Sequence, residues 1–288
     1  MKTLPILSMG LFACLASAQS APPASKTPQS SAPAAKASAV GSAWKSPFQA
    51  GRPSLKERPS GDKAIIHTMA DALGFVRGFG RGERTETLNR LQWFGAGRLM
   101  ENGHTYQVVK YSYALSLHLT GAREDIQFKA PGSVSERRVQ VFLDGQAWDE
   151  TTPGVGGTLA PNALKERDLR FLSTPFGFTK AILMAEPGSV KVNDPGPGGK
   201  VTISATLHQT AFTATLDPDF RPSIISFTSD GKKTEARWTA YRDLHGYGVM
   251  FPTHATLIEG GTVVRDLTID DGRVASYLIL QPPGTAGH

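Results

Sequence analysis

The sequence has a single cysteine, Cys14, and no apolar run long enough to span a bilayer. The chain beyond its N-terminus therefore has no disulfide and no thiolate chemistry, and its stability must come from its core. Several catalytic patterns are also missing: H-x-x-x-H, H-x-H and C-x-x-C metal motifs, the G-x-S-x-G nucleophile turn and the G-x-G-x-x-G loop. We therefore expect a non-enzymatic protein with no catalytic residue, no metal and no cofactor.

Residues 1–18 have the pattern of an export signal. Lys2 supplies the positive start, the short apolar run LPILSMGLFACLA follows, and Ala16-Ser17-Ala18 is an A-x-A cleavage site. We expect cleavage near Ala18 and a periplasmic or secreted product. In the alternative, Cys14 is acylated and anchors the protein, although a bulky Phe12 stands where a small residue is expected.

Residues 19–60 are rich in proline, alanine, serine and lysine, which predicts a disordered linker. They hold six basic residues and one acidic residue, so with Lys2 they account for the whole net charge of +6. Residues 61–288 are thus neutral and lack the basic surface that binds nucleic acid. The basic linker can still make a weak contact with an anionic membrane surface.

Residues 61–288 predict a single domain. Its start, SGDKAIIHTMADALGFVRGFG, has apolar residues at helical spacing after Ser60 or Asp62 as a cap, and glycines that end the helix. Residues 109–119 then alternate between apolar and polar, and residues 201–208 repeat the pattern. Alternation with period two is typical of strands with one covered and one solvated face.

Two-residue turn signals punctuate the predicted strands, at Asn102-Gly103, Asp144-Gly145, Asp230-Gly231, Gly260-Gly261 and Asp271-Gly272. Short loops of this kind join antiparallel neighbours. The segment APNALKERDLRFL predicts a second helix, and NDPGPGG, residues 193–199, predicts a loop that divides the strands into two groups. The fold class is therefore α+β, mostly β: a large antiparallel sheet with a helix on its apolar face.

The stretch DLHGYGVMFPTHATLIEGGTVVRDLTIDDG, residues 243–272, holds two of the histidines and predicts a hairpin that turns at Gly260-Gly261. His245 falls in a turn and His254 on the polar face of a strand, so a turn and a length of strand separate them. Metal ligands must converge, which argues against a metal site here and for scaffold.

Three histidines, His118, His208 and His254, fall on predicted polar strand faces. Three strands can bring them together, but solvated histidines are the simpler interpretation. Asp270 and Asp271 sit in a predicted tight turn, where aspartate serves backbone hydrogen bonding and not acid–base catalysis.

Large apolar side chains are expected on one face of the sheet. They form an ordinary core under the helices, or they line a cavity between sheet and helix that takes an acyl chain. Under the second hypothesis the candidate ligand-binding residues are Trp93, Tyr111, Tyr113, Leu115, Leu117, Phe142, Phe212 and Trp238.

Two long segments resemble exported proteins related to the LolA/LolB lipoprotein carriers: LQWFGAGRLMENGHTYQVVKYSYALSLHL and TLDPDFRPSIISFTSDGKKTEARWTAYRDLHGYGVMFPTHATLIEGG. In the second, Asp217 and Pro222 precede a strand, and WTAYRDL and GVMFP follow. The resemblance covers most of residues 61–288. It implies an unclosed, curved antiparallel β-barrel around one or two helices on its concave face, with a lipid-sized cavity, and it transfers no catalytic residues. The basic linker and the loops at 151–159 and 187–200 depart from the dedicated carriers.

We therefore expect an exported protein that binds a lipid or another hydrophobic ligand, as a carrier or an envelope sensor, with another envelope protein as a possible partner. Two alternatives stay open. One is a hydrolase of envelope material that uses His118, His208 or His254. The other is a protein–protein interaction module with a filled core.

Overall fold

The computed structural model describes residues 58–75, 88–130, 132–186, 188–274 and 278–284. The predicted signal, and the predicted linker up to residue 57, lie outside the described residues. The helices are α1 (Asp62–Leu73), the short 3-10 helix η1 (Pro161–Ala163), α2 (Leu164–Leu172) and α3 (Pro175–Met184). The strands are β1 (Arg90–Glu101), β2 (His104–Ser116), β3 (Gly121–Lys129), β4 (Glu136–Leu143), β5 (Gln146–Glu150), β6 (Thr158–Leu159), β7 (Val190–Asn193), β8 (Thr202–Leu207), β9 (Thr210–Leu216), β10 (Pro222–Ser229), β11 (Lys232–Thr239), β12 (His254–Glu259) and β13 (Thr262–Val274).

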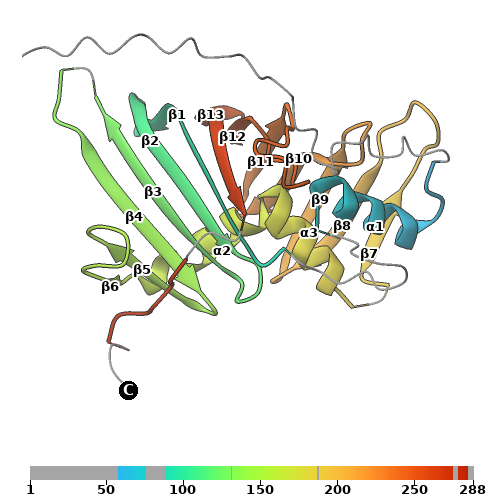
Figure 1. Ribbon diagram of the computed structural model, residues 1–288, viewed down its shortest axis with the longest axis horizontal. Coiled ribbons are helices and arrows are strands. Elements are labelled where there is room, and N and C mark those ends of the chain that lie inside the picture. The colour runs from blue at the N-terminus through green and yellow to red at the C-terminus, as the bar shows by residue number, and fades with distance from the viewer. Residues whose placement is uncertain (1–57, 76–87, 131, 187, 275–277, 285–288) are drawn as a thin grey trace, which may run out of the picture. The chain divides into compact units, whose positions relative to one another are not determined.

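All the described strands belong to one antiparallel sheet, in the order β6-β5-β4-β3-β2-β1-β13-β12-β11-β10-β9-β8-β7 (Figure 1). Its edges are β6 and β7, so the sheet is not closed. The chain builds one half from β1 outward to β6, crosses through η1, α2 and α3 to the far edge, and returns from β7 to β13 beside β1. The prediction of an unclosed antiparallel sheet with helices on one face is confirmed. The division of the strands is not where it was predicted, because the helices separate the two halves and the loop at 193–199 only joins β7 to β8.

Four of the five predicted two-residue turns connect neighbouring strands. Asn102-Gly103, Asp144-Gly145, Asp230-Gly231 and Gly260-Gly261 each have positive φ at both positions, and they join β1 to β2, β4 to β5, β10 to β11 and β12 to β13. Positive φ at both central residues matches the twist of a two-residue hairpin, and glycine, asparagine and aspartate adopt it at the least cost. These turns were therefore readable from the sequence.

The fifth predicted turn, Asp271-Gly272, is wrong. Both residues lie inside β13, where Asp271 pairs with Phe94 and Gly272 with Trp93 of β1, beside a bulge. Gly272 is needed for packing here and not for a turn. A Cβ on Gly272 would come within 2.7 Å of the Phe251 ring, so the missing side chain makes room for that ring.

Strand β1 is irregular where it crosses the middle of the sheet. Its register shifts between Phe94 and Gly95 against β13, and between Gly95 and Gly97 against β2. A Cβ on either glycine would overlap a carbonyl oxygen of β13, at Thr268 or Asp266. Only glycine permits so close an approach, and bulges of this kind bend a strand and increase its twist.

A bulge in β2 also corrects the predicted alternation of residues 109–119. The register against β3 shifts between Val108 and Lys110, so Val108 is buried and Val109 is exposed. Strand β2 then ends at Ser116, and Leu119 lies exposed in the following turn. Tyr111 to Leu115 follow the predicted pattern on the inward side.

Both predicted helices are present, and a third was missed. The first helix ends earlier than the predicted segment, because Gly74, with φ 91°, ends α1 and its N–H donates to the Asp71 carbonyl. Thr174 caps α3, because its hydroxyl accepts from the N–H of Gly177 at 3.0 Å, and Pro175 occupies the first turn. This Thr-Pro signal separates α3 from α2 although the apolar pattern runs through both.

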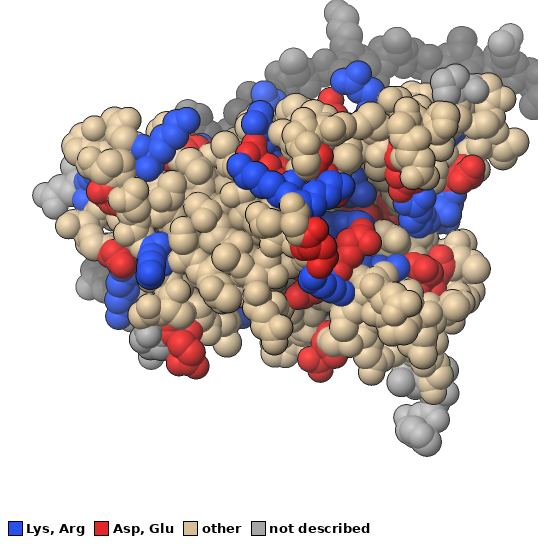
Figure 2. Space-filling model, turned by 180° about the vertical axis from the view of Figure 1, so that it is seen from behind, with Lys and Arg blue, Asp and Glu red and all other residues tan. Residues whose placement is uncertain are grey.

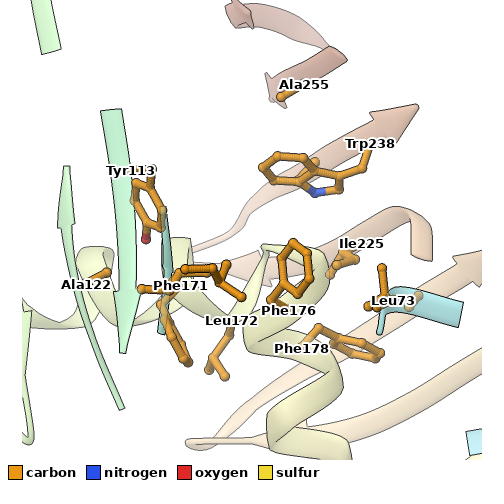
Figure 3. Close-up of a cluster of buried hydrophobic side chains, with 14 of the residues drawn as sticks. Leu73, Tyr113, Ala122, Phe171, Leu172, Phe176, Phe178, Ile225, Trp238 and Ala255 are labelled. Atoms are coloured by element: carbon orange, nitrogen blue, oxygen red, sulfur yellow. The ribbon is translucent and has the colours of Figure 1, made fainter. Parts of the chain in front are cut away.

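Helices α1, α2 and α3 cover the concave face of the sheet, and the main core lies between them and the strands (Figure 3). Arg167 fastens α2 to the sheet, because its guanidinium donates to the carbonyls of Val141 at 3.0 Å and Trp148 at 2.6 Å. Among the described residues, no helix is long and apolar enough to cross a membrane.

Candidate ligand-binding site

A small void lies between the concave face and the segment that joins α2 to α3. Its volume is about 30 Å³, roughly the room of one water molecule. It is lined by Tyr111, Tyr113, Arg170, Ser173, Thr174, Ala236, Trp238, Ala255, Thr256, Leu257 and Arg265. A second void of about 10 Å³ shares Tyr113 and Arg170 with the first. Sites for small molecules usually measure about 300–1,000 Å³, so neither of these two voids holds an acyl chain in this conformation. An open hollow of about 590 Å³ lies elsewhere, at the start of α1, and is lined by Ser60, Gly61, Asp62, Lys63, Ala64, His67, Thr68 and Asp71.

Aromatic side chains from the sheet and from α3 pack beside the residues that line the void, and Figure 3 shows Tyr113, Trp238 and Phe176 among them. The Trp93 ring stacks on Tyr113, with 5.2 Å between centroids, and meets Trp238 edge-on at 6.2 Å. Phe176 of α3 lies 6.0 Å from Trp93. The Trp238 indole also donates to the Ser173 carbonyl at 2.9 Å. This hydrogen bond ties the α2–α3 segment to β11.

One carboxylate beside the void is buried among cations. Glu124 of β3 is 2% exposed. It accepts a hydrogen bond from the Tyr111 hydroxyl at 3.0 Å and forms ion pairs with Arg170 of α2 and Arg265 of β13. We call these four residues the Glu124 cluster. It joins four elements, β2, β3, α2 and β13, and both of its arginines line the void.

The charges of the Glu124 cluster are stable over a wide pH range. Burial by itself raises the pKa of Glu124, but the attraction of Arg170 and Arg265 and the hydrogen bonds it accepts outweigh burial and hold that pKa at about 2. Burial, and then the charge of Glu124, raise the pKa of Tyr111 and of Tyr113. Near neutral pH the cluster therefore holds one carboxylate, two guanidiniums and a neutral phenol.

The cluster was missed in the sequence, although a signal exists. In GAREDIQF, Glu124 stands at an inward position between Ala122 and Ile126, and Arg265 stands two residues before the buried Leu267. A charged residue in an apolar register is rarely left buried without a partner. What the sequence does not reveal is the strand order, in which β2 and β1 lie between β3 and β13, so that Arg265 reaches Glu124 across both strands.

All eight predicted ligand-binding residues are buried. The structure brings three of them, Tyr111, Tyr113 and Trp238, to the larger void, and Phe142 to the smaller one. Trp93 packs behind Tyr113. Leu115, Leu117 and Phe212 line neither void; Phe212 packs on Phe227, with 4.9 Å between ring centroids.

The structure gives the histidines separate acidic partners. His208 contacts Asp168 and His254 contacts Asp266, each at 2.6 Å. His118 and His208 lie in turns and not on strand faces, because β2 ends at Ser116 and β8 at Leu207. No group of three or more metal-ligating side chains occurs among the described residues.

His245, from the stretch that suggested a hairpin, contacts Asp271 at 2.6 Å. The loop that carries it leads into β12, which pairs with β13 across the predicted Gly260-Gly261 turn. On the face shown in Figure 2, basic and acidic side chains lie side by side near the middle and form no field of one sign. Surface pairs of this kind contribute little to stability.

Comparison with solved structures finds chains of similar fold. The crystal structure of a LolA superfamily protein from Nitrosomonas europaea covers 75% of this chain and 94% of its own, at 13% sequence identity and a TM-score of 0.42. No family model matches the chain, and no curated protein matches its sequence. We therefore derive the function from this chain's own residues.

Proposed function

We propose that the protein binds a hydrophobic or amphiphilic molecule of lipid type between the concave face and the α2–α3 segment. The observation that carries the proposal is the void beside Ser173 and Thr174. On the sheet side, the small side chains of Ala236 and Ala255 lie next to Trp238. On the helix side, only the short polar residues Ser173 and Thr174 cover the core. These groups leave a void of about 30 Å³ at this point of the core.

A ligand must enlarge this space to enter. A lipid-sized site needs about ten times the volume present, so residues 170–174 move away from the sheet when the ligand binds. Three polar links resist the movement: the hydrogen bond from Trp238 to the Ser173 carbonyl, the ion pair between Arg170 and Glu124, and the hydrogen bond from Arg170 to Gln140 of β4. The bound ligand has to replace the contacts that Trp238 and Tyr113 lose.

The export pattern in residues 1–18 supports a role in the periplasm or outside the cell. A protein that encloses a hydrophobic ligand there serves as a carrier between membranes or as a sensor of envelope lipids. Another envelope protein as donor or acceptor of the ligand belongs to the same proposal. The basic residues between 19 and 60 supply a weak membrane-surface contact.

Uptake of an uncharged naphthylamine dye tests the proposal, because such a dye fluoresces strongly only away from water. Ala236→Leu fills the void and is expected to lower dye affinity by at least about tenfold, since a branched side chain then occupies the binding volume. The matched control is Ala211→Leu, an exposed position on β9 of the same sheet, which is expected to leave dye affinity unchanged.

Native mass spectrometry of protein purified without detergent supplies a second readout. A co-purifying mass of lipid size that disappears in Ala236→Leu supports the proposal. A mass without bound ligand, together with no uptake of the dye, refutes the proposal. The alternative is then a protein–protein interaction module whose core is filled.

A further inference from the structure

Two guanidinium groups face the same small void. Arg170 reaches it from α2 and Arg265 from β13, and their side chains are 18% and 13% exposed. Both therefore lie near the solvent side of the void, whereas Trp238 and Ala236 are buried more deeply. The void thus has a cationic rim and an apolar interior, which is the polarity of a site for an amphiphile.

Two arginines and two acids lie around the void, and only one of the acids is buried. Glu124 is the buried carboxylate that the two arginines share. The second acid, Glu166, pairs with Arg170, but its side chain is 67% exposed. Arg138 and Glu101, which lie nearby, pair with each other at 2.5 Å and add no net charge. The buried part of the cluster therefore holds two guanidiniums and one carboxylate, and the second carboxylate lies on the solvent side.

Arg265 has unused hydrogen-bonding capacity beside the void. Its two terminal nitrogens donate to Glu124. Its remaining donor, the Nε–H group, is buried and has no partner among the described residues. A buried donor without an acceptor is costly. A ligand oxygen placed in the void is the acceptor that this N–H lacks.

We propose that the natural ligand is an amphiphile with an oxyanion head, a carboxylate or a phosphate, which binds Arg265 and Arg170 while its chain enters toward Trp238. This inference rests on the proposed hydrophobic-ligand function and narrows it to one ligand class. An anion supplies the missing acceptor and a second negative charge on the buried side of the two guanidiniums. A neutral head supplies only the acceptor. A cationic head is repelled by the two guanidiniums, and Glu124 is already occupied because it accepts from Tyr111, Arg170 and Arg265.

Matched twelve-carbon probes test the head group. Dodecanoate, dodecyl phosphate and methyl dodecanoate are titrated into the purified protein at about pH 8, where the two acids are ionised, and binding is followed by tryptophan fluorescence and calorimetry. We expect at least one of the anions to bind at least about tenfold more tightly than the ester, the effect of one charge-assisted hydrogen bond. The stronger of the two anions identifies the source as a fatty acid or a phospholipid.

Two variants of the cluster are expected to act in opposite directions. Arg265→Gln removes one of the two guanidiniums and lowers the affinity for the better anion by at least about tenfold, while the affinity for methyl dodecanoate changes by less than about twofold. Glu124→Gln frees both guanidiniums and raises the affinity for that anion. Loss of folding cannot produce a gain of affinity, so the pair separates binding from stability. The control is Arg237→Gln, which is expected to leave all affinities unchanged. Arg237 lies on β11, and its exposed side chain pairs with Glu235.

The outcomes separate this inference from the proposed function. Equal affinities for anions and ester leave the hydrophobic site standing and overturn the anionic head. No binding of any of the three probes overturns both proposals. A Glu124→Gln protein with the wild-type circular dichroism spectrum and weaker anion binding also overturns the assignment to Arg265 and Arg170.

Discussion

Glu124→Gln should make the stability of this protein less dependent on pH. In the native protein the pKa of Glu124 falls from 4.5 to about 2, and one pKa unit is worth about 1.4 kcal/mol. The depressed pKa therefore contributes about 3 kcal/mol to the free energy of unfolding at neutral pH. Because the side chain is 2% exposed, solvent screening reduces this figure little. Breaking a buried ion pair costs a similar amount, about 3–5 kcal/mol.

The pH range of the effect follows from the sign of the shift. A carboxylate whose folded pKa is lowered stabilises the protein fully above its unfolded pKa of 4.5, and the stabilisation disappears as the pH falls toward about 2. The wild-type protein is therefore expected to exceed Glu124→Gln by about 3 kcal/mol at about pH 7 and by clearly less at about pH 3. Guanidinium chloride unfolding, followed by tryptophan fluorescence at several pH values, measures the difference.

A control variant isolates the buried carboxylate. Glu136 is exposed at the start of β4, and Glu136→Gln is expected to change the free energy of unfolding by no more than about 0.5 kcal/mol. If Glu124→Gln has the wild-type unfolding midpoint at neutral pH, or if its deficit stays constant between about pH 5 and about pH 3, then Glu124 does not carry the ion pairs assigned to it.

Two further changes test how the sheet is built. Gly272→Ala places a methyl group 2.7–2.8 Å from three atoms of the Phe251 ring and should lower the free energy of unfolding by about 1–3 kcal/mol; an unchanged denaturation midpoint would contradict the packing of that ring on β13. Asp217 accepts from the backbone N–H groups of Asp219 and Arg221, at 2.9 and 2.8 Å, in the turn before β10, so Asp217→Ala should cost about 1–2 kcal/mol and Asp217→Asn, which keeps an acceptor, less. Equal thermal melting temperatures for the Ala and Asn variants would argue against this turn.

Local sequence patterns predicted the hairpin turns correctly. They failed where pairing with a strand distant in the sequence determined the conformation. Asn102-Gly103 forms a hairpin turn because its two residues tolerate positive φ wherever they stand. Asp271-Gly272 has similar turn chemistry, but β1 pairs with it along its length, and the ladder of hydrogen bonds outweighs the turn preference of two residues. The same holds for Val109, where a bulge reverses which side of β2 is covered.

The sequence predicted only some of the residues of the candidate site. Tyr111, Tyr113 and Trp238 were predicted from the apolar face alone, and they line the void. Arg170 was missed because it looks like an ordinary exposed residue of an amphipathic helix. Its role depends on Glu124, which lies 46 residues earlier in the chain.

The sequence by itself determined the antiparallel strands, their hairpin turns, two of the helices and the apolar face, because each depends on backbone preferences and periodicity within a few residues. The tertiary structure alone decided how full the interior is and where its charges meet. Packing density depends on how side chains from the helices and from distant strands interdigitate, and the Glu124 cluster depends on the strand order that places β3 and β13 on either side of β2 and β1. Those are relations between distant segments, which no local pattern encodes.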